Sequence, residues 1–304
     1  MLGGVGNRSA AHAALQGLAL GDAFGECWFF RPAAFLDQAL AQRWVPAPPW
    51  FWTDDTAMAM SLVAVLHRHD HVDQDALARK FAAAYASDPH RKYGASMHEV
   101  LTGIRAGEPW REVTGRQFGG IGSWGNGAAM RVAPLGAWFA DDLDLVADQA
   151  SRSALVTHAH PEAAAGAVAV ALAAALNVRR IAGLALLTAV ASRTPASQVR
   201  DGIESAAKIP LRASPHAAAA ILGCGQQISA MDTVPFALWC AARHQDDLVE
   251  ALWTTVTPGG DLDTTCAIVG GVVAARTGLD AVPADWLAAR EPLPDWVTGL
   301  TTTS

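Results

Sequence analysis

Apolar residues recur along this chain at intervals of three and four, and alternation of apolar and polar residues is nearly absent. Such spacing gathers apolar side chains on one face of an α-helix, whereas a strand alternates every two residues. The pattern predicts a helix that Ser9 caps and that ends near Gly25, and then helices at about 53–67, 73–87, 94–106, 141–155, 160–177, 180–192, 197–207, 214–230, 233–243, 246–254 and 263–276. We therefore predict an all-α fold with a multi-helix core.

No linker or internal repeat divides the chain. We expect a single domain over residues 1–304, with its core at about 10–280 and a C-terminal tail at about 298–304 that frays. The longest apolar run, Ala163 to Leu176, has 14 residues and is mostly alanine. A run of that length is too short to span a bilayer, so it predicts a buried helix and no membrane partner.

Composition narrows the classes of protein further. The chain is 51% hydrophobic and 17% charged, which is enough apolar material for a large core. Its formal charge is −7, so bulk nucleic-acid binding is not expected, because phosphate backbones need clustered cations. The four cysteines are scattered and the N-terminus lacks the pattern of a signal peptide, which together favour a reducing, cytoplasmic location.

Three glycines share one face of the first predicted helix. Gly17, Gly21 and Gly25 recur every four residues, although each glycine in a helix interior costs about 1 kcal/mol. Their spacing indicates that a helix or ligand approaches that backbone closely. Asp22 lies on the same face, and if it is buried it needs hydrogen-bond partners. We expect it to hold the first acidic cluster, described next, in place.

Two acidic clusters each stand immediately before a long apolar helical run. The first acidic cluster is Trp52 to Thr56 (WTDDT), and the second is Gly259 to Thr265 (GGDLDTT). One Asp or Thr at such a place is an ordinary helix cap, but each cluster offers two carboxylates and further hydroxyls. Four carboxylates brought together would repel one another unless cations neutralised them. Oxygen ligands of this kind suit Mg²⁺, Mn²⁺ or Ca²⁺, so the clusters predict one or two hard divalent ions.

A glycine loop, Gly120 to Arg131 (GIGSWGNGAAMR), lies between the clusters and is expected to enter a helix at Ala128. Its small residues can present backbone N–H groups to an anion such as a pyrophosphate, and Trp124 can stack on a base or cover a ribose. Most glycine-rich loops are simply turns. His158, in the motif THAHP, opens another apolar helix, where a histidine is more often a core or capping residue than a ligand.

Six motifs in order carry a resemblance that runs from about residue 10 to residue 280. They are GLALGDAFGE, WTDDTAMAM, GSWGNGAAMRVAPLG, THAHPEAAAGAVA, DTVPFALW and GGDLDTTCAIVGGVVAARTG. The chain resembles the ADP-ribosylglycohydrolase family, which includes the dinitrogenase reductase-activating glycohydrolases. The resemblance implies an orthogonal all-α bundle with two Mg²⁺ or Mn²⁺ ions in a central cleft, and ADP-ribose or an ADP-ribosylated molecule as the substrate.

The resemblance also carries site residues over to this sequence. It implies the metal ligands Thr53, Asp54, Asp55, Asp261, Asp263 and Thr264. It implies that the ADP-ribose site is lined by Gly122, Ser123, Gly125, Asn126, Gly127 and Met130, with His158 near the phosphates or the distal ribose. Trp124 joins this set from its place in the glycine loop.

One departure concerns the acid or base of the reaction. Family members often carry a glutamate four residues after the second glycine of GDAxG, where this chain has Phe29, although Glu26 follows Gly25 directly. Asp55 or Glu26 is therefore the expected acceptor of the proton from the attacking water. The leading hypothesis is a hydrolase that releases ADP-ribose. The alternatives are a non-catalytic binder of ADP-ribose or a nucleotide, a metal-stabilised structural protein, and a dinuclear phosphoesterase.

Overall fold

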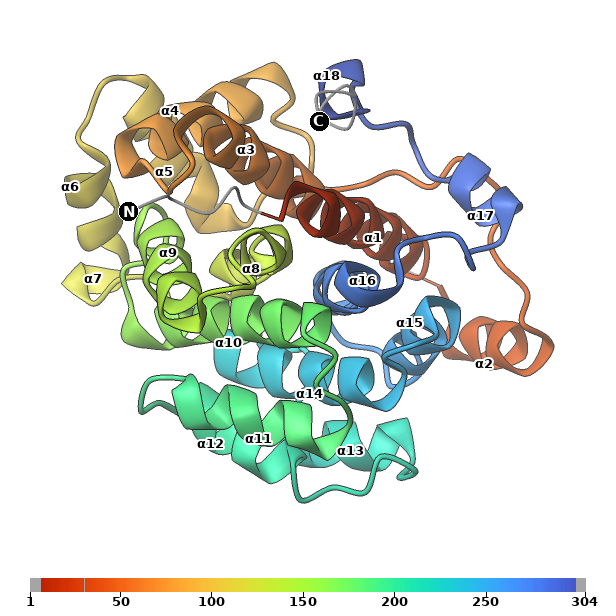
Figure 1. Ribbon diagram of the computed structural model, residues 1–304. Helices are drawn as coiled ribbons and strands as arrows, with labels where there is room; N and C mark the ends of the chain where they lie inside the picture. Colours follow the sequence, from red (N-terminus) through yellow and green to blue (C-terminus); the bar gives the residue numbers. More distant parts are fainter. Residues whose placement is uncertain (1–6, 30, 299–304) are drawn as a thin grey trace.

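The computed structural model describes residues 7–29 and 31–298, and within them the chain is helical (Figure 1). No β-strand occurs in these residues, where the extended contacts are two isolated bridges. The predicted all-α fold is therefore confirmed. The helices are α1 (Arg8–Glu26), α2 (Ala33–Gln42), α3 (Asp54–His69), α4 (Gln74–Ser87), α5 (Ala95–Arg105), α6 (Trp110–Gly115), α7 (Gln117–Gly120), the 3₁₀ turn η1 (Asn126–Ala128), α8 (Ala133–Trp138), α9 (Leu143–Leu155), α10 (Pro161–Val178), α11 (Leu184–Arg193), α12 (Gln198–Ala206), α13 (Pro215–Leu222), α14 (Ala230–Arg243), α15 (Leu248–Val256), α16 (Leu262–Thr277), α17 (Ala284–Ala289) and α18 (Asp295–Thr298).

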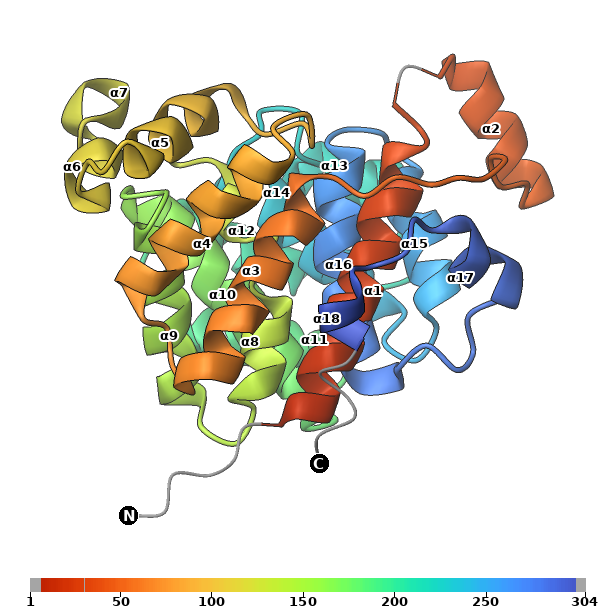
Figure 2. The same cartoon turned by 90° about the horizontal axis from the view of Figure 1, so that it is seen from above.

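The closest helix pair joins the two ends of the sequence. Helices α1 and α16 lie side by side through the middle of the molecule (Figures 1 and 2). The glycines of α1 make this possible, because a Cβ at Gly21 would overlap the carbonyl oxygen of Cys266, and one at Gly25 would overlap that of Leu262. The predicted close approach at the glycine face is confirmed. It sets Asp22 beside the N-terminus of α16, which carries the second acidic cluster.

Helix α10 is almost completely buried. It packs against α8, α9, α14 and α16, and most of its side chains have no solvent exposure. By length and composition alone it is apolar enough to cross a membrane, a property that it shares with buried core helices. The burial of the Ala163 to Leu176 run, as predicted, assigns it to the core.

Several predicted helix boundaries differ from those in the structure. The first helix is capped by Asn7, not Ser9, and the Asn7 Oδ1 accepts from the Ala10 N–H at 3.1 Å. The expected helix over 214–230 is shorter in the structure: α13 ends at Leu222, the chain turns at Gly223 with φ 82°, and a loop follows until α14 begins at Ala230. These ends depend on backbone angles that hydrophobic spacing does not encode.

The glycine loop also differs from its prediction. The chain does not enter a helix at Ala128, since η1 ends there and α8 begins only at Ala133. The expected 94–106 and 263–276 helices match α5 and α16 closely, whereas the short helices α2, α6, α8 and α17 were not predicted. Apart from Thr298, which ends α18, the predicted C-terminal tail lies outside the described residues.

Candidate active site

The first acidic cluster forms the N-terminus of α3. Thr53 caps the helix, and its Oγ1 accepts from the Asp55 N–H at 3.4 Å. Asp54 and Asp55 occupy the first turn, where the helix dipole favours a carboxylate. All three side chains are buried. The position is therefore more than a surface cap, because buried carboxylates need compensating partners.

Asp22 on α1 holds the first turn of α3 in place through hydrogen bonds. Its carboxylate accepts four hydrogen bonds, from the N–H and the hydroxyl of Thr53 (both 2.9 Å) and from the N–H and the hydroxyl of Thr56 (3.1 and 2.5 Å). Burial raises the pKa of Asp22 to about 6, against the lowering effect of these four bonds. The expectation that Asp22 holds the first acidic cluster in place is confirmed.

The second acidic cluster forms the N-terminus of α16. Asp261 is the N-cap residue, and Asp263 lies in the first turn, where its Oδ1 accepts from the Thr264 N–H at 2.8 Å. The glycine loop contacts this cluster directly, since Asn126 Nδ2 donates to Asp261 Oδ2 at 2.6 Å and to Thr233 Oγ1 at 3.0 Å. Asn126 thus ties the loop to both α14 and α16.

The two clusters, more than two hundred residues apart in sequence, line one pocket of about 540 Å³, which we call the aspartate pocket. The predicted residues that line it are Asp54, Asp55, Ser123, Trp124, Gly125, Asn126, Gly127, Met130, His158, Asp261, Asp263 and Thr264. Thr53 and Glu26 line an adjoining cavity instead. Gly122 lies behind the pocket wall, where a Cβ would stand 2.8 Å from the Cβ of Ala159. Both helix starts thus converge as expected.

The aspartate pocket is lined by more acidic than basic side chains. Burial is the largest cause of raised pKa values for all four aspartates: it raises the pKa of Asp54 to about 8 and the pKa values of Asp55 and Asp263 well above the usual range, and it raises that of Asp261 less. Neighbouring carboxylates add to the rise for Asp54, Asp55 and Asp263. Arg131 is the buried cation nearby, and burial lowers its pKa to about 9.

This donor set fits hard divalent cations by its chemistry. The ligands on offer are carboxylate and hydroxyl oxygens, and Asp55 Oδ1 is buried without any hydrogen-bond partner. Among the described residues, however, no three His, Cys, Asp or Glu side chains are already gathered as ligands around one point. The fit therefore rests on the oxygen donors, the unpartnered Asp55 oxygen and the shared pocket, not on a preformed coordination geometry.

The glycine loop and His158 form a further part of the wall of the aspartate pocket. A Cβ at Gly127 would stand 2.9 Å from the His158 ring, so only a glycine lets the loop lie against this histidine. Burial lowers the pKa of His158 to about 3, with Arg131 adding to the effect, and its Nδ1 shares a hydrogen bond of 2.7 Å with Thr157 Oγ1. A neutral imidazole therefore faces the loop.

Sequence reasoning missed several residues that line the pocket, and three of them share an unusual backbone conformation. Lys92, Phe118 and Ile228 all line the pocket, and all have positive φ angles (64°, 50° and 51°). Non-glycine residues rarely adopt this conformation, and local sequence does not announce it. The Phe118 ring stands 5.0 Å from the Trp124 ring, which extends the aromatic wall predicted at Trp124 alone.

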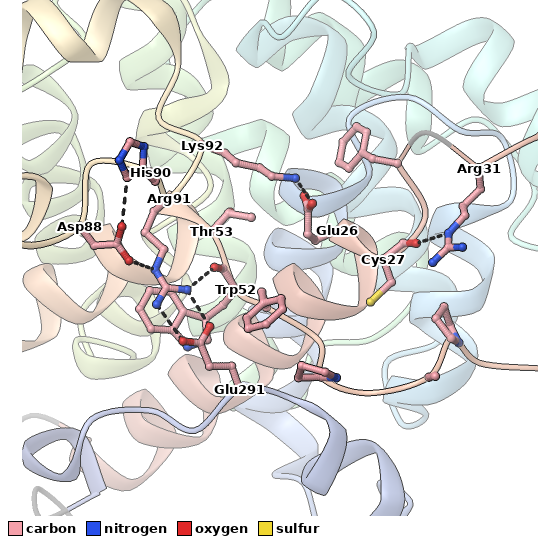
Figure 3. Close-up of a pocket in the computed structure, with 15 residues that line it drawn as sticks. Glu26, Cys27, Arg31, Trp52, Thr53, Asp88, His90, Arg91, Lys92 and Glu291 are labelled. Atoms are coloured by element: carbon pink, nitrogen blue, oxygen red, sulfur yellow. Dashed lines mark hydrogen bonds and ion pairs between the residues drawn. The ribbon is translucent and has the colours of Figure 1, made fainter.

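Glu26 lies in the adjoining cavity of about 710 Å³, which we call the side cavity (Figure 3). There it forms an ion pair with Lys92, the residue that lines both cavities. The Lys92 ammonium also stands 5.9 Å from the ring of Phe29. The carboxylate nearest in sequence to the expected glutamate position therefore lines the side cavity and not the aspartate pocket, and it is paired with Lys92.

The all-α fold, with acidic N-termini of two helices lining one pocket, defines a class of protein that has known relatives. The ADP-ribosylglycohydrolase family model matches residues 5–303. An uncharacterized protein of Archaeoglobus fulgidus is 30% identical over 307 residues, which is 94% of each chain. ADP-ribosylhydrolase ARH3 of Homo sapiens is 29% identical over 271 residues, covering 78% of this chain and 73% of that one.

The fold agrees with the sequence matches. A solved chain named as an ADP-ribosylglycohydrolase-related protein complex superimposes with a TM-score of 0.68 and 25% identity, over 97% of this chain and 96% of that one. This chain therefore belongs to the ADP-ribosylglycohydrolase family.

Proposed function

We propose that this protein is a metal-dependent hydrolase that cleaves the glycosidic bond between ADP-ribose and an acceptor. The observation that carries the proposal is the aspartate pocket, in which two acidic helix starts face a glycine loop. Family membership supports the same reaction. The pocket offers both halves that such a hydrolase needs, namely anionic oxygens for cations and backbone N–H groups for a pyrophosphate.

The oxygen donors of Thr53, Asp54, Asp55, Asp261, Asp263 and Thr264 are the proposed ligands of two Mg²⁺ or Mn²⁺ ions. Such ions supply charge to grip the ribose hydroxyls and to polarise the scissile bond. Asp22 supports this set through its hydrogen bonds to Thr53 and Thr56. Its part is to fix the direction of the first turn of α3.

The glycine loop orients the substrate in this proposal. Ser123, Gly125, Asn126 and Gly127 hold the pyrophosphate and distal ribose against His158. The imidazole there is neutral, so it donates or accepts a hydrogen bond without adding charge. The loop thereby places the anomeric carbon of the substrate over the carboxylates. This orients the substrate and takes no part in a chemical step.

Asp55 is our first choice for the group that takes the proton of the attacking water. It lines the aspartate pocket, whereas Glu26 lines the side cavity and its Oε1 is paired with Lys92. Each of the two carboxylates keeps one buried oxygen without a hydrogen-bond partner, so their places in the two cavities decide the choice. Hydrolysis passes through an oxocarbenium-like state that neighbouring carboxylates also stabilise.

A second candidate function is binding of ADP-ribose without cleavage. The observation that favours it is Phe29 at the position where the family often has a glutamate, together with the Glu26–Lys92 ion pair. A binder keeps the glycine loop and the acidic clusters but releases no product.

One experiment separates the two functions. A panel of molecules ADP-ribosylated on arginine, serine, a nucleobase or a small acceptor is incubated with the protein and Mg²⁺ or Mn²⁺, and free ADP-ribose is measured. Release from at least one conjugate that disappears in Asp263→Ala, while that variant keeps its helical circular dichroism, supports the hydrolase. Binding of ADP-ribose in calorimetry, with no release from any conjugate, supports the binder.

A further inference from the structure

The side cavity adjoins the aspartate pocket across the N-terminus of α3. Thr53 lines the side cavity, while the next two residues, Asp54 and Asp55, line the aspartate pocket. Lys92 lines both. None of the residues from Gly120 to Arg131 lines the side cavity. A substrate that places ADP-ribose on the glycine loop and its scissile bond at the aspartates therefore finds this cavity beside its leaving group.

We infer, on the basis of the proposed function, that the side cavity is the acceptor subsite and that it takes a polypeptide segment around the ADP-ribosylated residue. With a volume of about 710 Å³ it accommodates a modified side chain and its neighbours. Its lining comes from the end of α1, the loop before α3, the loop between α4 and α5, and Glu291 (Figure 3).

An exposed aromatic residue, Phe51, lies on the wall of this cavity next to a hydrogen-bonded stretch of backbone. The chain from Trp50 to Trp52 is extended, so successive side chains point to opposite sides. Trp50 and Trp52 are 1% and 9% exposed, which leaves Phe51 pointing outward at 57% exposure. The backbone there is locked, because the Trp50 N–H donates to the Ala289 carbonyl at 2.7 Å and the Glu291 N–H donates to the Trp50 carbonyl at 2.8 Å.

The apolar surface around Phe51 suits a peptide. Pro46 and Pro49 lie beside Phe51 in the lining, and Phe29 lines the cavity from the end of α1. Grooves lined by aromatic side chains receive extended peptide segments, which bury apolar side chains against them. Because the Trp50 backbone beside Phe51 is hydrogen-bonded to Ala289 and Glu291, little backbone ordering is needed there when a ligand covers the ring.

The charges of the cavity favour a peptide over a nucleic acid. Arg91 is held by Glu291 (2.6 and 2.8 Å) and by Asp88 (2.8 Å), and Lys92 is paired with Glu26. Arg31 is the one lysine or arginine in the described lining for which no carboxylate partner is found. A nucleic-acid groove needs several free cations along a phosphate backbone, whereas one guanidinium suits a peptide carbonyl or acidic side chain.

The test compares two acceptors that carry the same ADP-ribosyl linkage, chosen from those that the panel above shows to be cleaved. One is the single modified amino acid, and the other is a peptide of ten residues containing it. For Phe51→Ala we expect the ratio of kcat/KM for the peptide to that for the amino acid to fall about tenfold, mainly through the KM of the peptide. Ile221→Ala, an equally exposed apolar residue on α13, is the matched control and should leave the ratio unchanged.

An unchanged ratio in Phe51→Ala overturns the inference, as does an equal loss on both acceptors. A loss confined to an ADP-ribosylated oligonucleotide overturns it in favour of a nucleic-acid acceptor. If the wild-type protein cleaves nothing, the proposed function fails, and the subsite is then tested by calorimetry on the same two uncleaved conjugates. Tighter binding of the peptide conjugate that Phe51→Ala abolishes supports the subsite even in that case, and equal affinities refute it.

Discussion

Replacing Asp22 with alanine tests whether one buried carboxylate holds the first acidic cluster. In the wild-type protein this side chain is fully buried and accepts from two backbone N–H groups and two hydroxyls. In Asp22→Ala the hydroxyls of Thr53 and Thr56 can rotate towards other acceptors, since Thr53 Oγ1 already lies 3.2 Å from Asp55 Oδ2. The two backbone N–H groups cannot turn, and they lose their acceptor.

The expected loss follows from those two donors. Each buried donor left without a partner costs about 1–3 kcal/mol, so together they cost about 2–6 kcal/mol. Removing a buried carboxylate returns part of this, because burial already disfavours the charged form and raises the pKa of Asp22 to about 6. We expect the free energy of unfolding to fall by about 2–4 kcal/mol.

Urea denaturation followed by far-UV circular dichroism measures this loss in metal-free buffer. Asp142→Ala is the matched control, because Asp142 also accepts from two backbone N–H groups, at 3.1 and 3.0 Å, but at the exposed start of α9. Its loss should be near 1 kcal/mol, as for an ordinary helix cap. If the two variants lose equal stability, Asp22 is only a cap and the argument for its role fails.

Three further predictions follow from the same structure. In Gly21→Ala the free energy of unfolding should fall by at least about 3 kcal/mol, or the protein should fail to fold, because the added Cβ overlaps a backbone carbonyl of α16. Gly115→Ala is the control and should change the melting temperature little, because a Cβ there meets no atom within 4 Å. Equal melting temperatures of the two variants would contradict the close packing. In EDTA the free energy of unfolding should decrease as pH rises from about 6.5 to 8, because folded Asp54, with its pKa near 8, keeps a proton that the unfolded chain has lost, whereas the lowered pKa of His158 acts in the opposite direction only below about 6.5. Added Mg²⁺ or Mn²⁺ should flatten that slope, and a pH-independent stability in EDTA would refute the reasoning. Asp55→Asn should lower kcat by about 10²-fold or more and Glu26→Gln by less than about tenfold, and the reverse order in steady-state assays would assign the proton transfer to Glu26.

The sequence was informative where a pattern of residues carried an energetic cost. The repeat of Gly17, Gly21 and Gly25 predicted a close backbone contact, and the structure places α16 there. The two acidic clusters were predicted to meet, and they line one pocket. In each case the pattern carried a cost, either glycine in a helix or carboxylates in apolar surroundings, that only a tertiary partner explains.

The features that the sequence did not reveal depend on long-range geometry. Nothing local marks Lys92 as the residue between two cavities, because its left-handed backbone and its contact with Glu26 come from chain segments that meet only in the fold. Similarly, Phe51 is indistinguishable from a core aromatic until Trp50 and Trp52 are seen to face inward. The position of Glu26 outside the aspartate pocket was also beyond the reach of sequence spacing.

The pairing of α1 with α16 has a consequence for how the protein is made. The carboxylates of the aspartate pocket come from both ends of the chain, and Asp22 leaves the ribosome long before Asp263 is synthesised. Until α16 emerges, the glycine face of α1 has no neighbour and a nascent chain has half of the acidic set. The contact between these segments cannot form before α16 has been synthesised, so an incomplete chain carries no assembled aspartate pocket.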